Sequence, residues 1–250
     1  MPKTIAVAGK GGTGKSTIAA LIIKNLCQRK LGPILAIDAD ADSNLGTLLG
    51  IEPAQSIGEL RESLLQKIKE FPSGMSKARY FEAGLHQIIE EAAGFDLITM
   101  GRGEGAGCYC YLNSLIRKFS EDLAPSYAWV VIDNEAGLEH ISRRTSAYID
   151  ALCVIVTDNP LSFACAHRIA SLTKNLNDRI IKTYLITNMI KNQKKAAINK
   201  RLSKIEIEHL CDIPYDPKLE ELILGGKPIS NLGESPVNDC ISSIINTVGG

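Results

Sequence analysis

A glycine-rich segment near the N-terminus carries the residues with the clearest chemistry. It follows a short apolar run and contains Gly9, Lys10, Gly11, Gly12, Thr13, Gly14, Lys15, Ser16 and Thr17. The pattern GxxxxGKS over residues 9–16 fits the phosphate loop of nucleoside triphosphate-binding proteins. In such a loop, glycines let backbone N–H groups surround a phosphate at a helix N-terminus. Lys15 then reaches the β- and γ-phosphate oxygens, and Ser16 ligates Mg²⁺.

The same glycines fit two other interpretations. Gly9, Gly11 and Gly14 match the dinucleotide-binding fingerprint, and Asp38 lies at a suitable distance to bind a ribose. A plain glycine turn before a helix would require neither Lys15 nor Ser16. Because the phosphate loop explains more of these residues, the sequence favours binding of a nucleoside triphosphate.

Carboxylates end two further apolar runs. Asp38, Asp40 and Asp42 alternate at the end of one run, and Asp133 ends the run Trp129–Asp133. The second run has the Walker B pattern, in which the carboxylate holds the Mg²⁺ shell. Each aspartate alone could be a helix N-cap. Capping is a poor explanation for several carboxylates at strand ends beside one phosphate loop.

Two cysteines one residue apart, Cys108 and Cys110, follow a glycine-rich stretch. Their thiolates can bind one metal ion but supply only half of a tetrahedral sulfur shell. A twofold dimer would complete the shell by symmetry. The alternative is a pair of unliganded cysteines at a helix start, where a thiol pKa falls. Four sulfur ligands suit Zn²⁺ as well as Ni²⁺.

Short apolar runs alternate with amphipathic stretches along the whole chain, and this pattern predicts the elements that position these residues. Strands are predicted at Thr4–Ala8, Ile34–Asp38, Phe95–Met100, Trp129–Asp133, Ala151–Thr157 and Ile180–Thr187. Helices are predicted near 15–30, 57–70, 78–92, 110–122, 139–148, 161–176 and 193–204. Buried strands alternating with helices predict an α/β fold with a doubly wound, mostly parallel sheet. Without a Pro/Gly/Ser-rich linker, residues 1–250 are expected to form a single domain.

Composition excludes several classes of protein. The 250 residues are 45% hydrophobic, with 28 Lys plus Arg against 28 Asp plus Glu, which excludes a disordered or collagen-like chain. Zero net charge argues against retention on nucleic acid or a membrane by bulk electrostatics. The N-terminus lacks a signal peptide pattern, so a cytoplasmic protein is expected. All seven cysteines are therefore expected to be reduced, five of them as buried structural thiols.

Lys10, a second lysine inside the loop, gives the chain its resemblance to the deviant phosphate-loop ATPases, a family that includes MinD, ParA, ArsA and the nitrogenase iron protein. The resemblance implies a P-loop fold that binds ATP or ADP with Mg²⁺. It also implies a homodimer in which Lys10 crosses to the partner's nucleotide, with Lys10, Lys15 and Asp40 catalytic. Asp40 would position or activate the attacking water and Asp38 would lie near Mg²⁺, although three alternating carboxylates leave this assignment open. By the same resemblance, Asn188 would contact adenine and the loop containing Pro214 would pack over it.

Within that family, the segments Gly107–Cys110 and Asp133–His140 resemble the nickel-insertion ATPases that mature carbon monoxide dehydrogenase. This resemblance implies a dimer that holds Ni²⁺ or Zn²⁺ through Cys108 and Cys110, with carbon monoxide dehydrogenase as client. A sister group serves acetyl-CoA synthase. An iron–sulfur cluster of the iron-protein type is disfavoured, because the second switch, Asp133–His140, contains no cysteine.

A positioning or DNA-segregation ATPase of the MinD or ParA kind is the alternative. MinD-like proteins end in a basic amphipathic membrane helix, but Ser235–Val248 contains no Lys or Arg and is expected to pack on the core. A ParA-like role needs a basic surface, and lysines and an arginine do cluster over residues 191–204. We interpret that cluster as a solvated helix face.

Overall fold

The computed structural model describes residues 1–66, 83–101, 122–135, 148–174, 180–190 and 195–249. Eight strands form one sheet in the order β3-β4-β2-β5-β1-β6-β7-β8. All neighbouring strands are parallel except β3 and β4. The strands are β1 Lys3–Gly9, β2 Ile34–Ala39, β3 Glu90–Ala92, β4 Phe95–Thr99, β5 Trp129–Asn134, β6 Ile149–Val156, β7 Ile180–Asn188 and β8 Glu208–Ile213.

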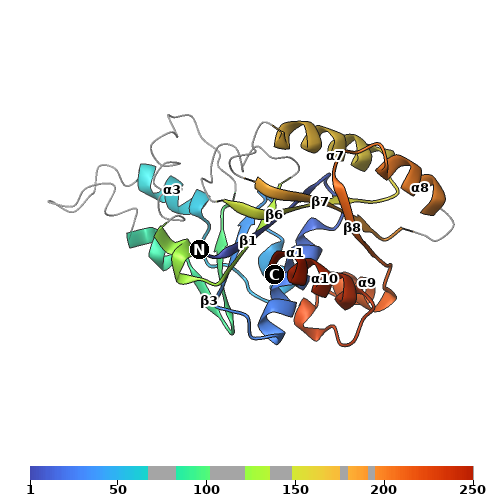
Figure 1. The fold of residues 1–250 in the computed structure, drawn as a ribbon. Coiled ribbons are helices and arrows are strands. Elements are labelled where there is room, and N and C mark those ends of the chain that lie inside the picture. The colour runs from blue at the N-terminus through green and yellow to red at the C-terminus, as the bar shows by residue number, and fades with distance from the viewer. Residues whose placement is uncertain (67–82, 102–121, 136–147, 175–179, 191–194, 250) are drawn as a thin grey trace.

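Helices cover both faces of this sheet (Figure 1). The described helices are α1 Lys15–Gln28, α2 Leu45–Leu49, α3 Ile57–Gln66, α7 Pro160–Thr173, α8 Lys195–Leu202, α9 Pro217–Leu224 and α10 Val237–Gly249. Helices α1 and α10 share one buried cluster with one set of strand side chains, whereas α7 and α8 share a second cluster with the other set. In β1, for example, Ile5 and Val7 join the first cluster and Ala6 and Ala8 the second. This alternation is what a strand buried on both faces requires.

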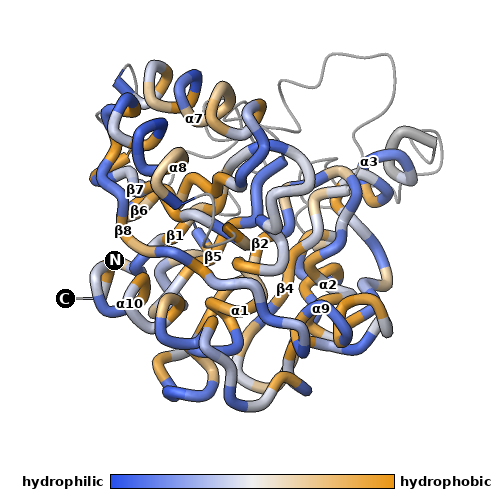
Figure 2. Tube along the Cα trace, turned by 90° about the vertical axis from the view of Figure 1, so that its right-hand side faces the viewer, coloured by the Kyte–Doolittle hydropathy of each residue, from blue (hydrophilic) through white to orange (hydrophobic). Residues whose placement is uncertain are grey.

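The hydrophobic positions concentrate along the central strands (Figure 2). Because β1, β2 and β5 lie in the middle of the sheet, the segments that follow their carboxyl ends are brought side by side. Val7 pairs in register with Asp133, and Asp38 pairs with Asp133 on the other side of β5. The topology therefore places the phosphate loop and the two acidic strand ends at one edge, as in other open parallel sheets.

The six strands predicted from apolar runs are all present, and the prediction of a mostly parallel α/β sheet is confirmed. Two strands were not predicted. Residues 90–92 were assigned to the end of a helix, but they form β3, which turns through Ala93 and Gly94 into an antiparallel pair with β4. Gly94 has a φ of 98°, a conformation that favours glycine in a tight hairpin turn. The helices predicted near 110–122 and 139–148 lie almost entirely outside the described residues.

Strand β8 was missed because it lies at the edge of the sheet and its residues are largely exposed or half-buried, so they do not form an apolar run. Helix α9 was also missed, although Asp216 caps it by accepting from the Lys218 N–H at 2.8 Å and Pro217 occupies its first position. Aspartate followed by proline is a recognisable helix start. Helix α10 buries its apolar side in the core, as predicted for the C-terminal segment.

The expectation that every cysteine is reduced is wrong, because Cys211 and Cys240 form a disulfide. Their positions 29 residues apart become adjacent only when the edge strand β8 packs against α10. Cys27, Cys153 and Cys165 are free, and the last two are buried as predicted. Among the helices of the described ranges, none combines the length and apolar character needed to cross a membrane.

Candidate nucleotide-binding site

The phosphate loop connects β1 to α1, and two of its glycines, Gly9 and Gly14, hold conformations that other residues could not adopt without strain. Gly9 has a φ of 147° and Gly14 a φ of 89°. A Cβ atom on Gly9 would lie 2.6 Å from the Ile155 carbonyl oxygen, and one on Gly14 would lie 2.6 Å from Asn188 Nδ2. Thr13 closes the loop by donating its hydroxyl hydrogen bond to the Lys10 carbonyl at 2.8 Å. The sequence pattern therefore corresponds to a loop that closes on itself and leaves no room for a side chain at Gly9 or Gly14.

Helix α1 presents its N-terminus to this loop. Among the described residues, no side chain caps the helix, and its first turn contains no acidic residue. The free backbone N–H groups and the helix dipole favour an anion here. Lys15 is the first residue of the helix and is only 6% exposed. A buried lysine beside unsatisfied N–H groups is a suitable environment for phosphate oxygens.

Asp133, at the end of β5, is completely buried, and neither carboxylate oxygen has a hydrogen-bond partner among the described residues. Burial raises the pKa of this carboxyl to about 7. The nearby Ser16 hydroxyl and the Lys15 charge oppose the rise, whereas the charges of Asp38 and Asp40 add to it. Ser16 does not reach either oxygen in hydrogen-bonding geometry. Two orphaned carboxylate oxygens facing a serine fit the second shell of a Mg²⁺ ion that Ser16 ligates.

Asp38 is also fully buried, but both of its carboxylate oxygens have partners. Oδ1 accepts from the Asp40 N–H at 3.1 Å and Oδ2 accepts from the Leu45 N–H at 2.9 Å. Burial raises its pKa to about 6, the two backbone N–H groups work against the rise, and the Asp40 charge adds to it. Asp38 therefore holds the segment between β2 and α2 in place. Asp40 is half-buried, and its Oδ1 accepts from the Asp42 N–H at 3.1 Å, so it is the more accessible of the two to solvent.

Asn188 ends β7 and contacts the phosphate loop directly. Its Nδ2 donates to the buried Thr13 carbonyl at 2.9 Å, and the side chain is only 6% exposed. One N–H of the amide is engaged with Thr13, and the amide oxygen, the acceptor of this side chain, is the group that could accept from an exocyclic amine. Asn188 thus links the phosphate loop to the neighbouring cavity that Asn188 also lines.

That space is a cavity of about 170 Å³ between the start of α1, the segment after β8 and helix α9. Pro214 lines it, as does Asn188, so the two residues predicted to surround a base lie together. Sequence reasoning missed the apolar residues that α9 contributes to the wall, which are Leu219, Ile223 and Leu224. The Asp216-Pro217 helix start was the signal that could have located them.

Two predicted features are not tested by these contacts. Lys10 is half-buried in the loop, where its carbonyl accepts from Thr13, and its contact with a partner's nucleotide stays a prediction. Cys108 and Cys110 lie outside the described residues. Within the described ranges, no group of three or more His, Cys, Asp or Glu side chains is placed to hold a metal ion.

Comparisons with known proteins agree with this geometry. Residues 4–229 match the CobQ/CobB/MinD/ParA nucleotide-binding domain. An uncharacterized ATP-binding protein of Methanocaldococcus jannaschii is 37% identical over 97% of this chain and 98% of its own length. The carbon monoxide dehydrogenase accessory protein CooC of Rhodospirillum rubrum is 29% identical over 86% of this chain and 85% of its own length.

Solved structures share the fold at lower identity. The MinD cell division protein of Aquifex aeolicus superposes with a TM-score of 0.70 at 20% identity, covering 99% of this chain and 97% of that one. A ParA family ATPase of Chlorobium tepidum gives a TM-score of 0.71 at 18% identity, covering 99% of each chain.

Proposed function

The chain belongs to the CobQ/CobB/MinD/ParA nucleotide-binding domain family, and within this family we propose that it is an ATP-dependent metallochaperone that supplies Ni²⁺ to carbon monoxide dehydrogenase. It is an ATPase, consistent with its ATP-binding relatives. The single observation that carries the metallochaperone proposal is the similarity to CooC over 86% of the chain, in a sequence that contains the Cys108-Tyr109-Cys110 segment.

The nucleotide part of the proposal assigns roles to the residues around the phosphate loop. Lys15 and the N–H groups at the start of α1 hold the phosphates, while Ser16 and Asp133 hold Mg²⁺. Mg²⁺ bound with ATP neutralises charge on the β- and γ-phosphates. Asp38 orders the segment after β2, and Asp40 orients the attacking water. Asn188 and Pro214 contact the adenine base.

The dimer part of the proposal rests on Lys10. A lysine delivered from the partner subunit would place positive charge on the transferred phosphoryl group only when two subunits face each other. ATP binding and dimerisation are then coupled. The same closed dimer brings together Cys108 and Cys110 of both subunits, whose four thiolates bind Ni²⁺ as cargo. Because the ion binds between subunits, its affinity depends on the nucleotide by linkage.

A metal titration tests this proposal. Ni²⁺ is added to the full chain with ADP, with ATP and without nucleotide, and the same series is run on the Cys108→Ala/Cys110→Ala variant. We expect one Ni²⁺ per dimer in the wild type, with a nucleotide-dependent affinity, and loss of this site in the variant. The matched control is Cys27→Ala/Cys165→Ala, which removes two free thiols elsewhere and should bind normally. Equal binding by wild type and the Cys108/Cys110 variant would overturn the proposal.

Two other functions remain as alternatives that the same protein can be tested for. An acetyl-CoA synthase client would give the same metal titration and would differ only in which apoenzyme accepts the ion. A MinD- or ParA-type role is favoured by the shared fold and by Lys195, Lys200, Arg201 and Lys204, on or just after α8. Against the MinD type, α10 has its apolar face in the core and not available to lipid. Salt-dependent retention on DNA would support the ParA type.

A further inference from the structure

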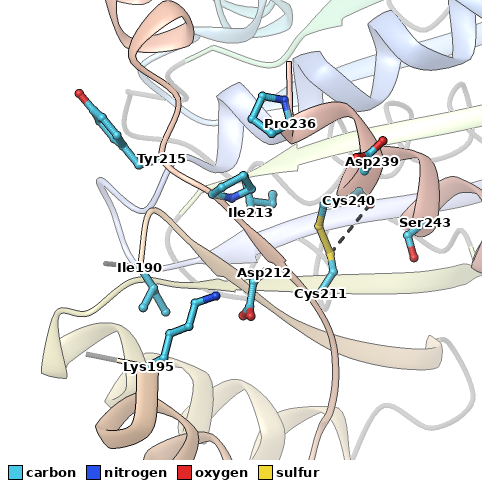
Figure 3. A pocket seen from close by; sticks show the side chains of 11 residues that line it. Ile190, Lys195, Cys211, Asp212, Ile213, Tyr215, Pro236, Asp239, Cys240 and Ser243 are labelled. Carbon is cyan, nitrogen blue, oxygen red and sulfur yellow. Dashed lines mark hydrogen bonds between the residues drawn. A yellow bond between two sulfur atoms is a disulfide. The ribbon is translucent and has the colours of Figure 1, made fainter. Parts of the chain in front are cut away.

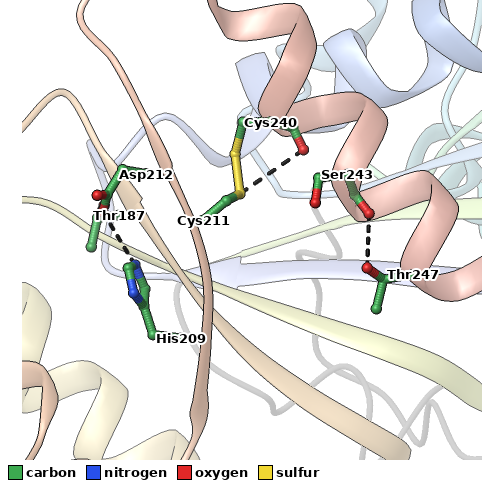
Figure 4. Close-up of a disulfide and its surroundings, with 7 residues drawn as sticks. All are labelled: Thr187, His209, Cys211, Asp212, Cys240, Ser243 and Thr247. Carbon is green, nitrogen blue, oxygen red and sulfur yellow. Dashed lines mark hydrogen bonds and ion pairs between the residues drawn. A yellow bond between two sulfur atoms is a disulfide. The ribbon is translucent and has the colours of Figure 1, made fainter.

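The Cys211–Cys240 disulfide lies outside the nucleotide site but close to it. It joins the edge strand β8 to helix α10 (Figure 4). It also lines a cavity of about 560 Å³ together with Lys195, Asp212, Asp239 and other residues (Figure 3). Cys240 is 7% exposed, whereas Cys211 is half-buried. The Cys211 sulfur can therefore be approached by a thiol from this cavity, whose volume is that of a small-molecule site.

The cavity shares a wall with the base cavity. Ile213, Pro214 and Tyr215 line both spaces, so the segment 212–216 separates them. We call this segment the partition loop. Any displacement of the partition loop toward the larger cavity would change the shape of the smaller one.

The partition loop is attached to α10 and its approach at both ends. At its start, Cys211 is bonded to Cys240 of α10. At its end, the Asp216 carboxylate accepts hydrogen bonds from the Ser235 hydroxyl and from the Lys218 N–H. Helix α10 is itself fixed to α1, since Asn25 donates to Ser242 at 3.2 Å and Arg29 donates to Asn246 at 2.9 Å. The disulfide is thus the covalent half of a two-point attachment to α10 and its approach, and α10 is hydrogen-bonded to the helix that begins at the phosphate loop.

The pairing of β8 in the sheet is weak at the start of the partition loop. In the pairing of β7 with β8, Leu185 lies opposite His209 and Ile186 lies opposite Cys211, so the register shifts by one residue at this point. Such a bulge disrupts the ladder locally. Because β8 is also the edge strand, it has a neighbouring strand on one side only. The disulfide compensates by fixing Cys211 from the α10 side.

We propose that the Cys211–Cys240 disulfide is a thiol–disulfide exchange site, and that its reduction by a dithiol weakens nucleotide binding in the neighbouring base cavity. A thiolate of the dithiol attacks the Cys211 sulfur, the S–S bond breaks, and Cys240 leaves as a thiolate that takes up a proton. The second thiol of the reductant then attacks the mixed disulfide, releasing Cys211 as a thiol. Two electrons pass to the protein, and the reductant ends as a disulfide.

The surroundings can accommodate the reduced state. The Cys240 carbonyl oxygen lies 3.9 Å from the Cys211 sulfur, within reach of the weak hydrogen bond that a thiol can donate. Once reduced, the partition loop keeps only its Asp216 end attached to the α10 region. Freeing the backbone of about one residue corresponds to a roughly fivefold loss of affinity.

The test measures ADP binding calorimetrically in Mg²⁺ without any transition metal, so it depends on the nucleotide site of the proposed function and not on Cys108 and Cys110. Full-length wild type is compared before and after dithiothreitol, with the state of Cys211 and Cys240 read by alkylation and mass spectrometry. We expect the Kd for ADP to rise about fivefold on reduction. The Cys211→Ser/Cys240→Ser variant should show the weaker affinity in both conditions, while its other cysteines control for reductant effects elsewhere.

Several results would overturn the inference. A bond that resists dithiothreitol in the folded protein would exclude exchange, and an unchanged Kd after verified reduction would exclude coupling to the base cavity. A response of equal size in the double serine variant would assign the effect to other cysteines. If neither form bound ADP, the nucleotide site itself would be refuted, which is distinguishable from a failure of the switch. The wild-type comparison needs no substitution and so does not depend on the variant's folding.

Discussion

The buried carboxylate of Asp133 should destabilise the protein when Mg²⁺ and nucleotide are absent, and replacing it should therefore stabilise the nucleotide-free chain. Its pKa is raised from 3.8 to about 7, mainly by burial. Between these values the unfolded chain has released the proton and the folded chain has retained it, so stability falls as pH rises from about 4 to about 7. Above pH 7 the full cost applies. The pKa difference corresponds to about 4 kcal/mol, and relaxation of the site leaves about 2–4 kcal/mol.

The perturbation is Asp133→Asn, which removes the charge and nearly keeps the shape. Neither the asparagine amide nor the Asp133 carboxyl has a hydrogen-bond partner at this position among the described residues. At pH 8 the variant and the wild type therefore differ mainly in the charge of this side chain. In EDTA at pH 8, we expect the variant to melt about 5–15 °C above wild type. At pH 5 the two should melt at similar temperatures, because Asp133 is then protonated in the folded state.

Adding Mg²⁺ and ADP should reverse the order. The wild type gains the stabilisation of a bound ligand, and the variant, which lacks the carboxylate for the ion, gains less. Asp122→Asn is the matched control, because it removes the same charge from an exposed position ahead of β5. If Asp133→Asn melts at or below the wild-type temperature at pH 8 without Mg²⁺, the burial argument is refuted. If it still gains as much as wild type from Mg²⁺ and ADP, the assignment of Asp133 to the ion is refuted.

Three further predictions use the same melting and binding assays. Gly14→Ala should lower the melting temperature of the nucleotide-free protein by the equivalent of about 1–3 kcal/mol, because its Cβ would lie 2.6 Å from Asn188 Nδ2 at a φ of 89°. Gly11→Ala is the control and should melt like the wild type, because its Cβ meets nothing within 4 Å. Equal melting temperatures for the two variants would contradict this prediction. Asn188→Ala should weaken ADP binding about five- to tenfold by calorimetry, because the Thr13 carbonyl loses its donor, and an unchanged Kd would remove Asn188 from the site. Reduction of the Cys211–Cys240 disulfide should lower the free energy of unfolding, measured by urea denaturation, by about 3–4 kcal/mol, because the bond closes a separation of 29 residues. An unchanged urea midpoint would show that the bond does not stabilise the protein.

The parts of the site that could be predicted from the sequence are those whose functional residues lie close together along the chain. The residues from Gly9 to Ser16 need no distant partner to be recognised, because the loop closes on itself through Thr13 and Lys10. Asp38 and Asp133 each end a buried apolar strand, and parallel strands bring such ends together. The observed burial of both carboxylates follows from the same topology.

The parts that sequence could not predict depend on contacts between distant segments. Nothing near Cys211 indicates that Cys240 will lie beside it, since the pair forms only where an edge strand meets a helix 29 residues away. All residues of strand β8 before Ile213 are exposed or half-buried, so no apolar run marks it. The wall of the base cavity follows from α9, a helix of eight residues, too short for helical periodicity to be seen in the sequence.

The phosphate site and the base site are connected directly through the side chain of Asn188. Its amide donates to the phosphate loop at Thr13, occupies the space that a Cβ on Gly14 would need, and lines the base cavity. Helix α1 carries Lys15 at its start and is hydrogen-bonded at its C-terminal end to α10, which is joined through Cys240 to the strand that leads into the partition loop. A nucleotide would therefore contact two ends of a single connected frame. Loosening either connection should weaken binding of phosphates and base together, so Asn188→Ala and disulfide reduction are expected to lower affinity for ADP without altering which base is preferred.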